Sequence, residues 1–452
     1  MSDDEKLKAA GKAGRIAEEY HRFYRGKMET VPKCAVRSME DFSVWYSPGV
    51  AEPCKAIHAD PELSFSYTNR WNTVAVVSDG SRVLGLGDIG PEAGYPVMEG
   101  KALLYKYLGG VDSVPIMLDT KDPDEIIRTV LLLQPSFGGI NLEDIAQPKC
   151  FRILETLRKK ASIPVWHDDQ QGTATVTLAG LLNALELTGR SIETARIVFV
   201  GAGAANVATA RLVFGRGGDP GRALVLDSKG ILGTHRRDLE KRKNEYYEKW
   251  QLCELTNAEG REGGIAEALD GADAVISLSK PGPGTILPEW IGAMAKDPIV
   301  FACANPVPEI WPWEAEEAGA AVVATGRSDF PNQVNNSLCF PGIFRGAIDS
   351  RATTITDEMC FAAAEAIASY AKEHDGYGPG HIVPTMEESG VFPKVAAAVG
   401  TQAAKEGISR NPISYEELFQ AAQTIITRSQ ALTKRMMEEN FIPEPPEVSD
   451  DV

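Results

Sequence analysis

The chain has 452 residues, 43% of them hydrophobic and 24% charged, which is enough for about two to four globular domains. Its formal net charge of −17 argues against a nucleic-acid partner, because a phosphate-binding surface needs an excess of basic residues. Seven cysteines without a Cys-x-x-Cys pair, an acidic amino terminus and no stretch of about 18 apolar residues favour a reduced, cytoplasmic protein without a secretory signal or a membrane span.

The first part of the chain mixes helical spacing with short apolar runs. Residues 5–27 are expected to form a helix, with Tyr20, Phe23 and Tyr24 on one face. Further along, the expected strands and helices follow in turn, at residues 74–77 (strand), 100–108 (helix), 115–118 (strand), a strand ending near Ile140, 149–160 (helix) and 163–166 (strand). This mixture predicts an α/β domain, and we assign it to residues 1–170.

From residue 171 onward, apolar strands alternate with helices more regularly. The expected strands are 196–200, 223–227, 274–277, 299–302 and 321–324, and the expected helices are 172–187, 205–214, 356–372 and 391–404. This alternation predicts a doubly wound, Rossmann-like parallel sheet over residues 171–405. Residues 406–452 are expected to form a C-terminal helical segment and a polar, disordered tail.

A glycine-rich turn follows the first strand of this second domain. It has the pattern Gly201-x-Gly203-x-x-Asn206, in which Asn206 takes the place of the usual third glycine. Asp227 ends the next strand, at the distance expected of an acid that binds the ribose of a dinucleotide. The strand before the turn and the helix after it favour a cofactor-binding turn over a purely structural one.

Asp227 and the residues after it indicate different cofactors. An acid at this position usually accepts the ribose hydroxyls of NAD. Ser228 and Lys229 come next, and a hydroxyl beside an ammonium group could instead bind the 2′-phosphate of NADP.

Two acidic pairs, Glu143-Asp144 and Asp168-Asp169, precede the glycine turn. Carboxylate oxygens are the ligands that a hard divalent cation such as Mg²⁺ prefers. Taken alone, each pair would be explained better as a cap of the helix that follows it. Because the two pairs occur together near a dinucleotide turn, we expect a metal site.

Several single polar residues are candidates for substrate chemistry. Lys101 lies at the start of an expected helix, and beside a metal and a nicotinamide it would have a depressed pKa and act as a base. Arg82 lies in a turn and could hold a substrate carboxylate in a bidentate manner. Tyr46, Asn305 and Asn336 have no spacing that distinguishes them from ordinary core or turn residues.

These residues together resemble the malic enzyme family, in its shorter, bacterial-type form. The matching segments are residues 46–54, 79–88, 100–101, 141–145, 167–174, 227–230, 335–336 and 340–342. They are spread over most of the chain, so the resemblance is specific.

The resemblance implies oxidative decarboxylation of L-malate to pyruvate and CO₂, with Mg²⁺ or Mn²⁺ and with NADP or NAD as cofactors. It implies that the metal is held by Glu143, Asp144 and Asp169. It implies that Lys101 is the general base, tuned by Asp168, and that Tyr46 is the general acid.

Binding roles follow from the same resemblance. Arg82, Asn305 and Asn336 are expected at the substrate, and Asn305 also at the cofactor. The other expected cofactor contacts are Gly201, Gly203, Ala204, Asn206, Asp227, Ser228 and Lys229. The resemblance also implies a homodimer and favours NADP, because Asp-Ser-Lys-Gly at 227–230 is similar to the NADP-using members.

Two alternatives remain open at this point. One is a malolactic or oxaloacetate-decarboxylating relative that uses the same site without net redox. The other is a non-catalytic, dinucleotide-binding regulator. Such a regulator should have lost one of the catalytic or metal-binding residues, and none is missing from this sequence.

Overall fold

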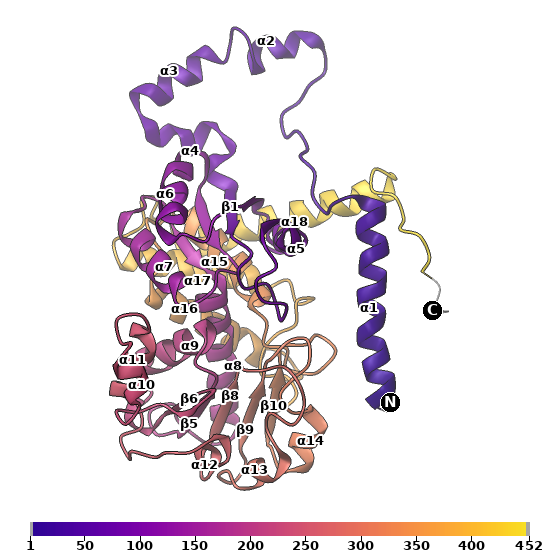
Figure 1. Ribbon diagram of the computed structural model, residues 1–452. Coiled ribbons are helices and arrows are strands. Elements are labelled where there is room, and N and C mark those ends of the chain that lie inside the picture. Colours follow the sequence, from indigo (N-terminus) through magenta and orange to yellow (C-terminus); the bar gives the residue numbers. More distant parts are fainter. Residues whose placement is uncertain (1–2, 449–452) are drawn as a thin grey trace.

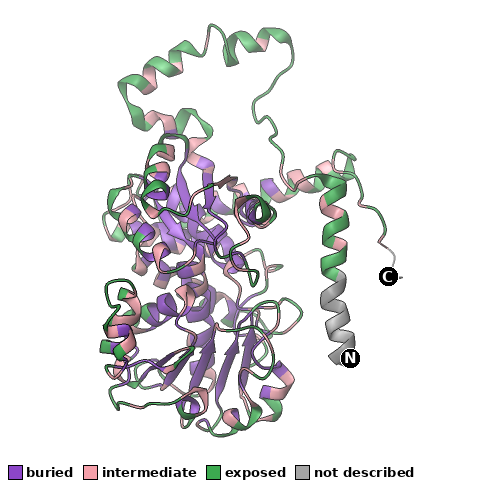
Figure 2. Cartoon of the chain, in the orientation of Figure 1, coloured by how far each residue is buried: buried purple, intermediate pink, exposed green. Residues whose placement is uncertain are grey.

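The computed structural model describes residues 3–448, so the end of the predicted tail, residues 449–452, lies outside the described part. The chain forms two sheets surrounded by helices, one above the other in Figure 1. Most of their strands are buried (Figure 2), as expected of apolar runs that are covered on both faces, while β2 (Asp112–Met117) is only partly buried. The predicted α/β fold class is confirmed. Within residues 3–448, no helix is both long and apolar enough to cross a bilayer.

The first sheet is entirely parallel, with the strand order β2-β1-β3-β4. Its strands are β1 (Thr73–Ser78), β2 (Asp112–Met117), β3 (Gly139–Leu142) and β4 (Val165–His167), and the helices that connect them are α5 (Pro91–Gly109), α6 (Pro123–Leu133) and α7 (Lys149–Lys160). Leu142 of β3 pairs with His167 of β4. The residues that follow these two strands therefore emerge side by side at one edge of the sheet.

The second sheet has the order β10-β9-β8-β5-β6-β7, with only β7 antiparallel. Its strands are β5 (Ile197–Val200), β6 (Leu224–Asp227), β7 (Gly230–Ile231), β8 (Ala274–Ser277), β9 (Ile299–Ala302) and β10 (Val322–Thr325). This arrangement confirms the predicted Rossmann-like sheet.

Helices cover both faces of the second sheet. One layer consists of α8 (Thr173–Leu187), α9 (Ala204–Gly215) and α16 (Asp357–Lys372), and the other of α12 (Ile265–Leu269), α13 (Pro288–Gly292) and α14 (Pro312–Glu317). The first layer belongs to an apolar core that continues into the first sheet, whereas the second layer has a smaller core of its own. Shorter helices of the two bodies are α4 (Ser64–Tyr67), α10 (Arg237–Glu240), α11 (Tyr247–Leu255), η3 (Asn69–Asn72), η4 (Gln134–Ser136), η5 (Asp168–Gly172), η6 (Pro220–Arg222) and η7 (Asn336–Leu338).

The last helices of the chain return to the first sheet. They are α15 (Phe340–Asp349), α17 (Val391–Lys405) and α18 (Tyr415–Glu438). Helices α15 and α18 both pack against α5, and α17 packs between α15, α16 and α18. The carboxyl-terminal part of the chain therefore helps to build the body that carries the first sheet (Figure 1).

Helix α5 is longer than predicted. It begins at Pro91 instead of residue 100, and Lys101 lies in its middle. Gly94 and Pro96 have low helix propensity, which concealed the first turns in the sequence. Burial of Gly94, Met98 and Ala102 against neighbouring elements holds those turns in place, so packing overrides propensity here.

The amino-terminal region extends away from both bodies. Helix α1 (Asp3–Tyr24) is followed by an arm, residues 25–63, that carries η1 (Met39–Asp41), α2 (Phe42–Trp45), α3 (Ala51–Ala59) and η2 (Pro61–Leu63). Figure 1 shows α2 and α3 projecting above the first sheet, and Figure 2 shows that the arm is almost entirely exposed. Within the described part of the chain, residues 34–59 make their side-chain hydrogen bonds only to one another.

Candidate active site

Lys101 lies at the centre of the candidate site, although it is 93% buried. Its Nζ lies 2.6 Å from Oε1 of Glu143 and also donates to Oδ2 of Asp168. The ammonium group lies 4.5 Å from the centre of the Phe340 ring. Burial alone would lower the pKa of Lys101, but the charges of Asp168 and Glu143 outweigh burial and raise it. The depressed pKa expected from the sequence applies to a lysine beside a bound cation and a nicotinamide, and it stays a prediction.

Glu143 is positioned by the residue two places before it on β3. The Asn141 amide donates to Oε2 of Glu143 at 2.8 Å, and its carbonyl oxygen accepts from the Tyr105 hydroxyl at 2.9 Å. All three side chains are buried. The orientation of Glu143 is thus set by a chain of hydrogen bonds that ends in α5.

Three carboxylates lie together beside Lys101. Glu143, Asp144 and Asp169 each place one oxygen within 4.8 Å of the others. Oδ2 of Asp144 is buried without a hydrogen-bond partner, and Oδ2 of Asp169 accepts from the Asp144 backbone amide at 2.8 Å. Neither pair caps the following helix, since α7 and α8 begin without any side-chain cap. The capping interpretation of the acidic pairs is therefore wrong.

The protonation of these carboxyl groups reflects their crowding. Burial, and next the charge of Asp169, raise the pKa of Asp144 to about 8. Burial also raises the pKa of Glu143, because it outweighs the opposing effect of Lys101. Buried like charges of this kind are stabilised by a cation placed between them.

Asp168 begins a single turn of π-helix, η5, between β4 and α8. The Trp166 indole donates to its Oδ1 at 3.0 Å, and Lys101 binds its other oxygen. A Cβ on Gly172 would lie 2.0 Å from Oδ1 of Asp168, so only glycine lets the carboxylate fold back over this turn. Isolated π-helical turns of this type often occur at functional sites.

The predicted substrate-binding residues approach this cluster from three loops. The Arg82 backbone amide donates to the Asp144 carbonyl at 3.0 Å, while its guanidinium donates to the Leu84 carbonyl at 2.6 Å. Cβ of Asn336 lies 3.3 Å from the position of a Cβ on Gly172. Asn305 lies against the loop of the first domain, because its carbonyl oxygen would be 3.1 Å from a Cβ on Gly85. Loops of both sheets thus meet at the site.

Tyr46 is the predicted residue that the chain does not bring to this cluster. It follows α2 at the far end of the arm and is 74% exposed. Its position reflects the arm, which makes no side-chain hydrogen bond to either body within residues 34–59.

The glycine turn has the shape expected of a dinucleotide site. Gly201 has φ +100°, and a Cβ there would lie 2.6 Å from the Leu278 carbonyl oxygen. Gly203 is the N-cap of α9, and Ala204 is its first residue. Asn206 is buried, and its amide donates to the carbonyls of Val200 and Gly201, both at 2.9 Å. Asn206 therefore braces the turn from within.

Asp227 is paired with a residue that sequence reasoning missed. Arg236 binds both its oxygens, at 2.8 and 3.1 Å, and binds Asp238 as well. Lys229 lies 2.9 Å from Asp238. The negative charge at the end of β6 is thus compensated by a buried guanidinium. Arg236 belongs to no recognisable motif. It comes close to Asp227 because the chain turns back at β7.

Glu309 is a second residue without a sequence signal. It is fully buried and accepts from the Ser279 and Ala304 amides at 2.8 and 3.0 Å. Burial raises its pKa, against the effect of these hydrogen bonds. Because the Ala304 amide directly precedes Asn305, Glu309 positions the loop that presents Asn305.

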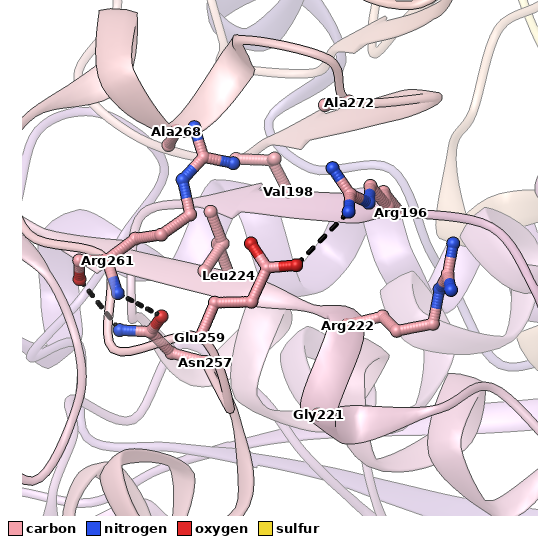
Figure 3. Close-up of a pocket in the computed structure, with 10 residues that line it drawn as sticks. All are labelled: Arg196, Val198, Gly221, Arg222, Leu224, Asn257, Glu259, Arg261, Ala268 and Ala272. Atoms are coloured by element: carbon pink, nitrogen blue, oxygen red, sulfur yellow. Dashed lines mark hydrogen bonds and ion pairs between the residues drawn. The ribbon is translucent and has the colours of Figure 1, made fainter.

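A small cavity near the start of β5 and β6 is not part of this site. Figure 3 shows its lining, in which Arg196 pairs with Glu259 at 3.1 Å and Asn257 bonds the Arg261 backbone. Its volume of about 20 Å³ is room for about one water molecule. It lies at the amino ends of the strands, whereas the glycine turn lies at their carboxyl ends.

Comparison with known proteins identifies relatives over nearly the whole chain. A bifunctional malic/malolactic enzyme of Bacillus subtilis is 49% identical over 407 residues, which are 90% of this chain and 96% of that protein. An NADP-dependent malic enzyme of Halomonas elongata is 43% identical, over 88% of this chain and 94% of that protein. The solved malic enzyme of Entamoeba histolytica has a TM-score of 0.95 at 48% identity, over 99% of this chain and 93% of that one.

The family models agree with these relatives. Residues 25–158 match the malic enzyme N-terminal domain, and residues 170–405 match the malic enzyme NAD binding domain. The glycine turn and Asp227 thus lie in a dinucleotide-binding domain, whereas Glu143 and Asp144 lie in the first match and Asp169 lies one residue before the second. The chain belongs to the malic enzyme family.

Proposed function

We propose that this protein catalyses the oxidative decarboxylation of L-malate to pyruvate and CO₂, with NADP⁺ or NAD⁺ as the oxidant and with Mg²⁺ or Mn²⁺. The observation that carries this proposal is the buried Lys101 between Glu143 and Asp168, next to three clustered carboxylates. A base beside a cation site and a dinucleotide turn suits the oxidation of a hydroxy acid. Relatives named as NAD- and NADP-dependent malic enzymes support the same reaction.

Glu143, Asp144 and Asp169 are the residues that would hold the cation. They fit it because their oxygens lie within 4.8 Å of one another and Oδ2 of Asp144 is buried without a partner. They are oxygen ligands only, which suits Mg²⁺ or Mn²⁺. When bound, the cation would polarise the C2 oxygen of the substrate, and the nicotinamide would accept the hydride.

Lys101 is the proposed base for the C2 hydroxyl proton. Its ion pairs raise its pKa, so Lys101 must first release its proton to solvent, which leaves Asp168, in contact with it, as a carboxylate. Asp168 then stabilises the ammonium group that forms when Lys101 takes the hydroxyl proton. Oxidation comes first, because loss of CO₂ needs the neighbouring carbonyl that oxidation creates.

Arg82, Asn336 and Asn305 are the proposed substrate contacts. Arg82 lies beside the Asp144 backbone, and its exposed guanidinium suits a carboxylate of malate. Asn336 lies next to Gly172, one turn from the cation ligands. Asn305 adjoins Gly85 of the first domain, where it would contact substrate and nicotinamide together.

We further propose that the protein acts as a homodimer in which the arm of one copy supplies Tyr46 to the other. The support is that the arm exposes apolar side chains that a monomer has no reason to leave in water. They are Val31, Val36, Met39, Phe42, Val44, Trp45, Tyr46 and Val50. In this arrangement, Tyr46 would protonate C3 of the enol left by CO₂ loss.

For the cofactor, we propose that NADP⁺ is preferred and that NAD⁺ is used weakly. Arg236 compensates the charge of Asp227, which would otherwise repel a 2′-phosphate. Lys229 is largely exposed, and among residues 3–448 its ammonium group pairs only with Asp238, so it is free to exchange that partner for a phosphate. Ser228 offers a hydroxyl beside it.

The decisive test is a set of initial rates with L-malate and Mn²⁺, comparing NADP⁺ with NAD⁺ and assaying pyruvate, lactate and reduced nicotinamide. Pyruvate and reduced cofactor in equal amounts support the proposal. The bifunctional relative makes a malolactic reaction the second candidate, and lactate without net cofactor reduction would favour it. No turnover of malate with either cofactor contradicts both.

A further inference from the structure

A second cluster of metal-ligating side chains, separate from the three carboxylates, lies in the loop between α16 and α17. Nitrogens of His374 and His381 and an oxygen of Glu388 all lie within 4.8 Å of one another. The two imidazole rings stack, with their centres 4.4 Å apart. His381 Nε2 lies 3.7 Å from one Glu388 oxygen, and His374 Nε2 lies 4.0 Å from the other.

Two atoms of this cluster lack the partners that buried polar atoms need. Nε2 of His381 and Oε2 of Glu388 are both buried without a hydrogen bond. Both belong to residues whose ligand atoms lie within 4.8 Å of one another. A single cation there would satisfy both atoms at once.

We propose that His374, His381 and Glu388 form a binding site for Zn²⁺. Zinc favours imidazole nitrogen and carboxylate oxygen, at about 2.0–2.2 Å, in a tetrahedron whose ligand atoms are about 3.3 Å apart. The three ligand atoms lie within 4.8 Å of one another, so they need to approach by at most about 1.5 Å. The fourth ligand is water, because His374 is half-exposed at the mouth of the cluster.

One hydrogen bond must be given up when zinc binds. The Gly376 amide donates to Nδ1 of His374 at 3.0 Å, so the neutral ring carries its proton on Nε2. Zinc at Nε2 moves that proton to Nδ1 and displaces the Gly376 amide. Since Gly376 is exposed, water replaces the lost bond, at a cost of the small net worth of a neutral hydrogen bond.

The proposed site would stabilise a loop that contacts Asn332, four residues before the substrate candidate Asn336. Asn332 donates to the Pro379 carbonyl at 2.7 Å and accepts from the Ile382 amide at 2.8 Å. Asn183 of α8 donates to the Ile382 carbonyl at 2.8 Å. Zinc would link His374 and Glu388, which lie before and after the segment that contacts Asn332. Its role is therefore stabilisation of the loop and not catalysis.

Zn²⁺ titration of the metal-stripped, full-length protein in excess Mg²⁺ tests the proposal, because Mg²⁺ occupies the oxygen-only ligands. Calorimetry should show one Zn²⁺ per chain, with an accompanying rise in the thermal midpoint. His374→Ala, His381→Ala and Glu388→Gln should each weaken binding by at least about a hundredfold, the upper end of what loss of a ligand's own partner causes. Glu387→Gln is the matched control, an exposed neighbouring carboxylate, and should bind like the wild type.

Two further readouts keep the result interpretable. His374→Ala removes a half-exposed ring, so its thermal midpoint without zinc should match the wild type even if His381→Ala folds poorly. Co²⁺ in place of Zn²⁺ should give tetrahedral ligand-field absorption without the thiolate charge-transfer band that the exposed Cys34 and Cys54 would add. Zinc binding that survives all three substitutions, or that is absent from the wild type, overturns the proposal.

Discussion

The Nζ of Lys101 lies 2.6 Å from Oε1 of Glu143, and neither side chain is exposed to solvent by more than 7%. Asp168, the first residue after β4, binds the same ammonium group. The proposed base is thus paired on two sides with carboxylates that directly follow neighbouring strands. Its protonation is governed by their charge, so chemistry at this lysine depends on what else occupies the site.

Lys101→Ala is expected to lower kcat for malate oxidation about a hundredfold to ten-thousandfold, the range for loss of a general base. Lys101→Arg keeps a cation between Glu143 and Asp168 but cannot accept a proton, so it should be equally inactive while remaining as stable as the wild type. Steady-state rates and thermal midpoints of both variants check this. Substantial activity in Lys101→Arg would show that the residue serves only as a cation.

Mixing two inactive variants tests whether Tyr46 acts across a dimer. A dimer of one Tyr46→Phe chain and one Lys101→Ala chain holds one complete site if the arm is exchanged, and none if it is not. After subunit exchange at equal amounts, half of the dimers are mixed, so about a quarter of the wild-type activity should return. Each variant alone should stay inactive under the same treatment. If the mixture also stays inactive while mixed dimers are detected, exchange of the arm is wrong.

A divalent cation is expected to stabilise the protein more at high pH than at low pH. Asp144 has a raised pKa of about 8 in the folded protein, against about 4 when unfolded. Its contribution to stability is therefore fully present below about pH 4 and is lost as the pH rises to about 8. A cation offsets this loss, because it favours the ionised carboxylate.

Thermal midpoints in EDTA and in Mn²⁺, measured at about pH 5 and about pH 8, check this expectation. The gain from Mn²⁺ should be larger at the higher pH. Asp144→Asn, which does not ionise, should show less pH dependence in EDTA than the wild type.

Asp169→Asn should fold but lose most activity, and full turnover in excess EDTA would rule out the cation site.

Cofactor preference should change when Arg236 is neutralised. Arg236→Gln leaves the charge of Asp227 uncompensated, so kcat/KM should fall at least about tenfold more for NADP⁺ than for NAD⁺. Lys229→Ala should raise the KM for NADP⁺ and leave that for NAD⁺ nearly unchanged. Arg237→Gln removes the adjacent exposed arginine and is the control. Equal losses with both cofactors would mean that Arg236 only supports the fold.

Gly172→Ala is expected to disable the site through Asp168. The new Cβ would lie 2.0 Å from Oδ1 of Asp168, so the carboxylate must leave its position over the π-helical turn. We expect kcat to fall at least about tenfold, with a loss of stability of about 1–3 kcal/mol from the crowding. Gly100→Ala has no atom within 4 Å of its new Cβ and should behave like the wild type, although it adjoins Lys101. Wild-type kcat in Gly172→Ala would show that the position of Asp168 does not matter.

Much of the second domain could be predicted from local sequence patterns. The apolar runs at 274–277 and 299–302 coincide with β8 and β9, because a strand buried on both faces must be apolar throughout. The glycine turn was recognisable because Gly201 needs a positive φ. The start of α5 was not, since Pro91, Gly94 and Pro96 oppose a helix that only packing stabilises.

By itself, the sequence determined which residue types the site contains and which sheets carry them. Only the tertiary structure decided that Lys101 pairs with Glu143 and Asp168, which are 42 and 67 residues away, because parallel neighbouring strands bring these residues to one edge. It alone paired Asp227 with Arg236 across β7 and carried Tyr46 away from the site on the arm. Charge compensation and exposure depend on contacts between residues that are distant in the sequence. Local sequence patterns do not specify these contacts.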